Sequence, residues 1–195
     1  MSNDSLKAGT LVWSGEHWIN YIRRPGESTD SGMVSLYNTR FSAAGEGIAA
    51  FVYIPGNDGF TGYCTNNREV ASFMFDTMIR GKGNAFDREL PVLDATFEYE
   101  GDAAKQATWT IEASGRRVES VWTITEPPTM MYGPAHSGEP MEIFSVLNFT
   151  NKTSMKLDGR AVEGKPYTRD IWKKSIGGDR SSCVFALAET FIRIG

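Results

Sequence analysis

The sequence predicts an all-β protein, an antiparallel barrel of about eight to ten strands with one short helix near residues 67–80. Three observations lead to this prediction. Apolar and polar residues alternate with a period of two through most of the chain, a single segment has helical spacing, and aromatic residues make up 12% of the sequence. At 195 residues one hydrophobic core suffices for folding, so residues 1–195 are expected to form a single domain.

The alternation is clearest in residues 106–113, where an apolar side chain at every second position predicts a half-buried strand. Ser114-Gly115 then predicts a tight turn into residues 117–125, so that these two runs form a hairpin. Asp158-Gly159 predicts a second tight turn. The remaining expected strands share the same period and cover residues 18–23, 33–41, 47–54, 92–99, 141–149, 154–157 and 181–194.

Residues 67–80 have the spacing of an amphipathic helix, because apolar side chains recur from Val70 to Met78 at i, i+3, i+4 and i+8. Asn66, with a glutamate three residues later, resembles a capping box, and Gly81 follows the last turn. The apolar stripe is wide. We therefore expect the helix to plug an opening or to pack across a sheet.

Residues 126–140 contain four of the eight prolines and are expected to form a long loop. Loops of this length in a compact domain are usually functional or mobile. The segment is therefore a candidate gate over a binding site, and the alternative is a plain surface connection.

Composition and charge exclude several classes of protein. The formal net charge is −4 and no three Lys or Arg residues are consecutive, which argues against nucleic-acid binding. The longest apolar stretches, 47–54 and 183–188, are much shorter than the roughly 20 residues that a membrane span requires. The N-terminus has neither the basic start nor the apolar stretch of a secretory signal, which predicts a cytoplasmic location.

Metal and cofactor chemistry also lacks its usual residues. Cys64 and Cys183 are far apart with no histidine nearby, so we expect two free thiols and no metal site. The motifs of serine hydrolases, of phosphate-binding loops, of zinc proteases and of dinucleotide-binding folds are all missing from the sequence, which predicts chemistry without a cofactor. The sequence leaves open whether two copies of the chain form a homodimer.

The C-terminal part resembles a known family. Residues 157–164 read Leu-Asp-Gly-Arg-Ala-Val-Glu-Gly, and they are followed by Arg-Asp-Ile-Trp at residues 169–172 and by the long strand 181–194. This order of turn, tryptophan and strand resembles the lipocalin-like domains of the carotenoid hydratase and AttH type. The resemblance implies a calycin-like barrel with a hydrophobic ligand cavity. Members of that type usually contain two barrels, whereas this chain has the length of one.

The chain is rich in aromatic residues and methionine. Their apolar surface predicts a small hydrophobic ligand, aromatic or polycyclic, inside the barrel. Tyr21 and Arg23 share a strand face and are expected to orient an oxygen atom of this ligand. The alternatives are that the aromatic residues fill the core and that Arg23 forms a surface salt bridge. The expected aromatic lining consists of Phe97, Tyr99, Trp109, Trp122, Phe144 and Phe185.

Four residues are the candidate proton carriers. His17 and His136 are the two histidines of the chain, and histidine is the side chain most often used to carry protons near neutral pH. Glu189 shares its predicted strand face with Phe185 and other apolar residues, where a carboxyl group is rare, and Tyr132 lies in the proline-rich segment beside His136. The alternatives are that each histidine lies at the surface and that Glu189 faces solvent.

Two functions remain. The first is an enzyme, a lyase or isomerase, that carries out cofactor-free acid–base chemistry (isomerisation, dehydration, hydration or cyclisation) on a hydrophobic molecule in the cavity. The alternative is a non-catalytic carrier of such a molecule. A purely structural interaction domain is a third hypothesis, less favoured than these two. An enzyme requires at least two polar groups that converge on one ligand atom, whereas a carrier requires only an apolar cavity.

Overall fold

The computed structural model describes residues 8–81, 83, 85–135 and 140–194. These residues form one mostly antiparallel sheet, the helix α1 (Arg68–Met74), the π-helical turn η1 (Phe75–Ile79) that continues it, and the helix α2 (Asp170–Ser175). The strands are β1 (Gly9–Ile22), β2 (Gly32–Ser42), β3 (Gly47–Ile54), β4 (Phe60–Thr65), β5 (Val92–Asp102), β6 (Gln106–Ala113), β7 (Arg116–Thr123), β8 (Thr129–Pro134), β9 (Met141–Phe149), β10 (Lys152–Leu157), β11 (Arg160–Ala161) and β12 (Val184–Ile194). The prediction of a mostly β, mostly antiparallel fold is confirmed, but the described residues form twelve strands rather than eight to ten, and a second helix, α2, is present.

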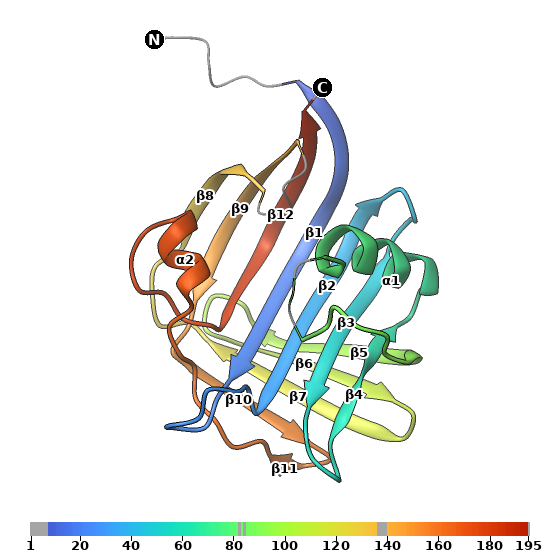
Figure 1. Ribbon diagram of the computed structural model, residues 1–195, viewed down its shortest axis with the longest axis vertical. Helices are drawn as coiled ribbons and strands as arrows, with labels where there is room; N and C mark the ends of the chain where they lie inside the picture. Colours follow the sequence, from blue (N-terminus) through green and yellow to red (C-terminus); the bar gives the residue numbers. More distant parts are fainter. Residues whose placement is uncertain (1–7, 82, 84, 136–139, 195) are drawn as a thin grey trace.

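The strand order is β11-β10-β7-β6-β5-β4-β3-β2-β1-β12-β9-β8, and β4 with β5 is the parallel pair. The strands β5, β6, β7, β10 and β11 turn away from the others and cross behind them (Figure 1). Among the described residues the two edge strands, β8 and β11, do not pair with each other, so closure of the predicted barrel is not found. The sheet instead folds over and packs against itself.

Two hydrophobic cores follow from this folding. The inter-layer core lies between the two parts of the sheet and contains Trp18 and Phe185 from one part and Trp109 and Trp122 from the other. The helix-side core lies on the opposite face of β1, β2, β9 and β12. The helices α1 and α2 and the turn η1 cover this second face (Figure 1). Alternate residues of β1 therefore serve two different cores.

The helix predicted near residues 67–80 is present, and its apolar stripe packs across the sheet. The capping residue is Asn67 rather than Asn66: the Asn67 side chain accepts hydrogen bonds from the first turn, while Asn66 accepts one from the backbone of Ile48 at 2.7 Å. Gly81 has φ +73° after the last turn, as a left-handed helix end requires. None of the helices in the described part of the chain has the length and apolar character needed to cross a membrane.

Both predicted tight turns are present, since Ser114-Gly115 and Asp158-Gly159 have positive φ at each residue. The prediction of a continuous loop over residues 126–140 is wrong, because it contains the strand β8, which pairs with β9. Met131 and Ala135 are buried there in the helix-side core, and this burial outweighs the turn preference of the prolines at either side.

The two thiols provide a direct test of this packing. Cys64 and Cys183 are free and fully buried, and burial raises the pKa of Cys64 to about 12 and also raises the pKa of Cys183. Because the thiolate is the reactive form, we expect neither thiol of the folded protein to react with Ellman's reagent at about pH 8. Both should react after unfolding in guanidinium chloride. Fast reaction of a thiol in the folded protein would contradict the burial described above.

Candidate functional site

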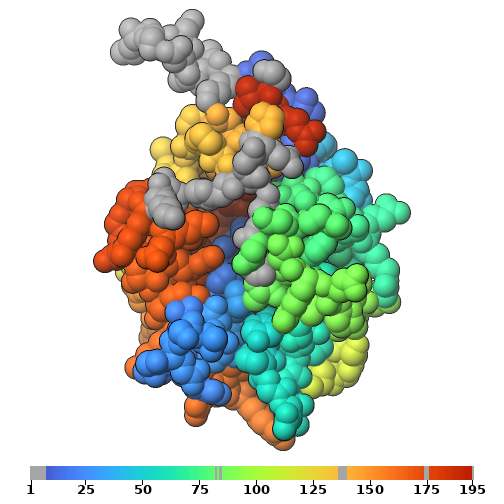
Figure 2. All heavy atoms as spheres, in the orientation of Figure 1, coloured from blue at the N-terminus to red at the C-terminus, as the bar shows by residue number. Residues whose placement is uncertain are grey.

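A cavity of about 530 Å³ lies on the helix-side face of the sheet. Its floor is formed by β1, β2, β9 and β12, and its rim by η1, β8 and α2. Figure 2 shows the surface hollowed between the orange-red segment of α2 and the green segment of α1 and η1. The volume lies within the range of roughly 300–1,000 Å³ that is typical of small-molecule sites. The apolar walls include Ile19, Met131, Ile143, Leu147, Val184 and Phe191.

A chain of four polar side chains crosses the floor of this cavity. Nδ1 of His17 lies 3.1 Å from Oε1 of Glu189, and Nε2 of His17 lies 3.0 Å from Oγ of Ser35. The hydroxyl of Ser145 donates to Oε2 of Glu189 at 3.0 Å. Glu189 and Ser35 are buried, and His17 is largely buried. Each member except Ser145 also lines the cavity.

Irregularities in two strands bring this chain together. The β1–β12 register shifts between Gly15 and His17, and the β12–β9 register shifts between Ala186 and Glu189. A bulge moves the following residues to the other face of a strand. Strict alternation predicted that Glu189 shares a strand face with Phe185, which belongs to the inter-layer core. Because of the bulge, Glu189 instead faces the helix-side core together with Ala186. The imidazole of His17 and the carboxyl group of Glu189 thus point to the same side of the sheet.

Two tyrosines complete the polar floor. The ring of Tyr37 stacks on the imidazole of His17 with the centroids 4.0 Å apart. Burial raises the pKa of Tyr37 and of Tyr21, while the hydrogen-bonding interaction of each phenol with Ser35 and the charge of Arg169 act in the opposite direction. Both phenols therefore stay protonated at neutral pH and are available as hydrogen-bond donors.

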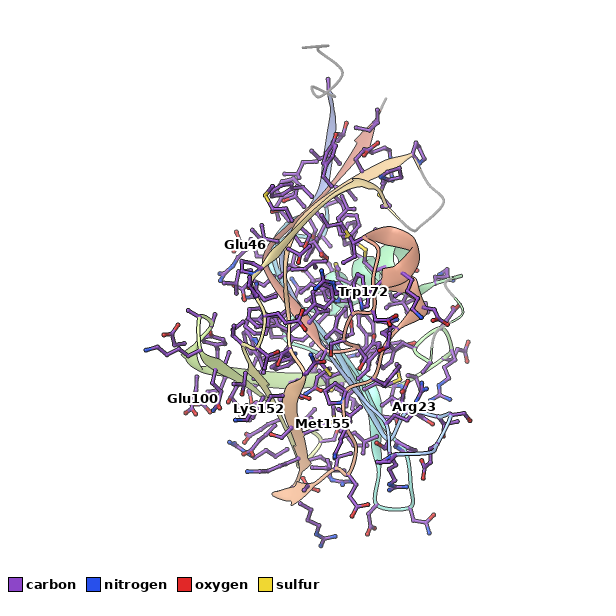
Figure 3. The ribbon with its side chains drawn as sticks, turned by 90° about the vertical axis from the view of Figure 1, so that its left-hand side faces the viewer. Arg23, Glu46, Glu100, Lys152, Met155 and Trp172 are labelled. Atoms are coloured by element: carbon purple, nitrogen blue, oxygen red, sulfur yellow. The ribbon has the colours of Figure 1, made fainter. Side chains whose placement is uncertain are left out.

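Four of the residues predicted for the site lie around the cavity: His17, Glu189, Tyr21 and Phe185. Arg23 does not line it, because its guanidinium pairs with Asp30 at 3.1 Å. In Figure 3 Arg23 lies well away from Trp172, which marks the cavity. His136 lies outside the described residues.

The other predicted residues lie elsewhere. Trp109, Trp122 and Phe97 belong to the inter-layer core, because the face of β5–β7 on which they lie packs against the other layer of the sheet. Tyr99 is partly exposed at its edge, against Trp18 and Trp109. Tyr132 and Phe144 are 58% and 42% exposed and are paired in register between β8 and β9. Most of the residues predicted to line the cavity thus lie in the inter-layer core or at the surface instead.

Among the lining residues that sequence reasoning missed are four with polar groups that the site uses: Ser35, Tyr37, Arg169 and Trp172. Ser35 and Tyr37 follow Met33 on one face of a predicted strand, and a small polar residue on such a face was a usable signal. Nothing in the sequence around Arg169 and Trp172 indicates that α2 reaches back over the cavity.

In the part of the chain that the structure describes, no group of three or more His, Cys, Asp or Glu side chains is arranged to hold a metal ion. Comparison of the chain with protein-family models, with curated proteins and with solved structures finds no match. The function of the protein is therefore inferred from the chemistry of the cavity.

Proposed function

We propose that the protein is a cofactor-free enzyme, a lyase or isomerase, that moves a proton on a small and largely apolar molecule bound in the cavity. The observation that supports this proposal is the hydrogen-bonded chain from Glu189 through His17 to Ser35 at the floor of an apolar cavity. A buried carboxylate paired with an imidazole is typical of general acid–base sites. The lipocalin-like resemblance also implies a hydrophobic ligand, but one inside a barrel, whereas this cavity lies between the sheet and its helices.

The hydrogen bonds support a separate role for each group. A carboxylate only accepts hydrogen bonds, so Glu189 fixes the tautomer of His17 in which Nδ1 carries the proton and Nε2 accepts from Ser35. Ser35 is then the group between His17 and the ligand. It passes its own proton to Nε2 as it takes one from the ligand, and Glu189 stabilises the imidazolium that forms. The proton returns by the same path to another atom of the ligand.

The tyrosines and the walls supply the rest of the catalysis. Tyr21 and Tyr37 are protonated donors beside Ser35, so they can stabilise negative charge that develops on an oxygen of the ligand. The apolar walls bind the body of the ligand and exclude water, which strengthens these interactions. A carrier would need the walls alone.

The order carboxylate, imidazole, hydroxyl also favours a second candidate, acyl transfer with Ser35 as the nucleophile. Ser35 would attack an ester carbonyl, and His17 would pass the hydroxyl proton to the leaving alcohol before water releases the acid. A fluorophosphonate reagent distinguishes the two candidates. Covalent labelling of Ser35 would support acyl transfer, and an unlabelled protein that still catalyses proton transfer would support the first proposal.

The proposal is tested with a nitrobenzisoxazole, a flat apolar molecule whose ring opens with a change in absorbance when a base removes its C–H proton. We expect ring opening with saturation kinetics, faster than in a solution of free imidazole of equal concentration, and competition by acetylnaphthalene. Binding of both compounds without catalysis would favour the carrier. If neither compound binds, both functions are wrong.

A further inference from the structure

Helix α2 brings two hydrogen-bond donors to the rim of the cavity. Arg169 is the residue that precedes the first turn of α2, and Trp172 follows one turn later, so both lie on the same side of the segment. Figure 3 shows Trp172 beneath α2, toward the interior of the protein. The floor with His17 belongs to the strands β1, β2 and β12, so the two groups of polar side chains come from different elements.

The indole N–H of Trp172 has no acceptor among the described residues. The side chain is 6% exposed, its Nε1 is buried, and its ring packs edge-on against Phe149 with the centroids 5.3 Å apart. A buried donor without a partner destabilises the folded protein. Such a donor calls for an explanation, and an acceptor supplied by a bound ligand is one.

The guanidinium of Arg169 also lacks an ion-pair partner within the described part of the chain. It is the one Lys or Arg side chain on the described lining, and its identified contact is the ring of Tyr21, 4.9 Å from its central carbon. The neighbouring carboxyl groups are already used: Asp30 pairs with Arg23, and Glu189 binds His17 and Ser145. Arg169 thus carries a positive charge toward the cavity without a matching anion from these residues.

We propose that Arg169 and Trp172 bind the carboxylate of an apolar carboxylic acid, whose body fills the cavity and whose other end meets Ser35 and His17. This inference rests on the proposed function and specifies its substrate class. A carboxylate matches the planar guanidinium and accepts from the indole as well, whereas a neutral carbonyl would leave the charge of Arg169 unmatched. A phosphate monoester carries about −1.5 to −2 charges at neutral pH, more than the single cation on the described lining balances.

The charge distribution favours one orientation of this ligand. Glu189 is the one carboxyl group on the described lining, and it lies with His17 at the floor. An anion is therefore repelled from the floor and attracted to the rim at Arg169. The reacting end of the molecule is left at Ser35, the group that exchanges protons with His17.

The test compares naphthoate with acetylnaphthalene, its neutral analogue of similar shape, by isothermal titration calorimetry. We expect naphthoate to bind at least about tenfold more tightly, the effect of a charge-assisted hydrogen bond. The variant Arg169→Gln should lose this preference and keep its affinity for acetylnaphthalene within about twofold, and Arg169→Lys should retain part of the preference. The matched control is Arg24→Gln, because Arg24 lies outside the cavity and should leave both affinities unchanged.

Trp172→Phe keeps the packing of the ring and removes the donor, so naphthoate should bind more weakly while unfolding by urea is little changed. Equal affinity of the wild-type protein for both compounds would overturn the carboxylate inference and leave the proposed function standing. A preference for naphthoate that persists in Arg169→Gln would overturn the assignment of Arg169. Failure of both compounds to bind would overturn the proposed function together with this inference.

Discussion

Replacement of Trp18 by alanine is expected to lower the free energy of unfolding by about 3–5 kcal/mol, as for other large aromatic residues removed from a core. Trp18 is 0% exposed and lies at the centre of the inter-layer core. Its ring stacks on Phe185 at 4.2 Å and meets Trp122 at 5.3 Å. Its removal leaves a cavity between the two layers of the sheet that these rigid neighbours cannot fill.

Urea unfolding followed by far-ultraviolet circular dichroism measures this effect. The control is Phe41→Ala, because Phe41 is also an aromatic residue of the sheet but is 45% exposed, and we expect a change below about 1 kcal/mol. Similar losses for the two variants would show that the two layers are not packed through Trp18. The cavity lies on the other face of β1, so we expect Trp18→Phe to leave binding of acetylnaphthalene intact.

The distribution of aromatic residues explains why the fold was easier to predict than the site. Alternation correctly indicated that Trp109 and Trp122 each lie on a buried strand face. It does not indicate what that face meets, because a period of two is the same for a strand that lines a cavity and for one that packs on another layer. The long strand β1 contributes to both cores, and the sequence alone does not indicate which of its faces belongs to which core.

The candidate site was predictable only in part, for a similar reason. His17 and Glu189 were found because histidine is scarce in this chain and a carboxyl group on an apolar strand is rare. Their meeting depends on two shifts of register, which residue patterns do not reveal. Ser35 reaches His17 through pairing of β1 with β2, and Arg169 reaches the cavity through the path of the chain between β11 and β12. Contacts of this kind are properties of the folded chain.

The variant His17→Ala is expected to lower kcat/KM for ring opening of the nitrobenzisoxazole by about 10²–10⁴-fold, the usual contribution of one general base. His17 links Glu189 to Ser35, so its removal interrupts the proposed path of the proton at its centre. Glu189→Gln should also reduce the rate, because a neutral amide still orients the imidazole but stabilises the imidazolium less. Ser35→Ala should have an effect of similar size to His17→Ala if Ser35 relays the proton.

A double variant distinguishes two side chains that act as one catalytic unit from two that contribute independently. Residues that act in one chain are not additive, so Ser35→Ala combined with His17→Ala should be hardly slower than His17→Ala alone. The matched controls are Glu98→Gln and Ser154→Ala, two exposed residues that lie outside the cavity and should keep the wild-type rate. Circular dichroism and binding of acetylnaphthalene verify that each variant is folded with its cavity intact. Multiplicative losses would mean that Ser35 and His17 do not act in one proton path, and near-native turnover of His17→Ala would leave the carrier as the better account of the same cavity.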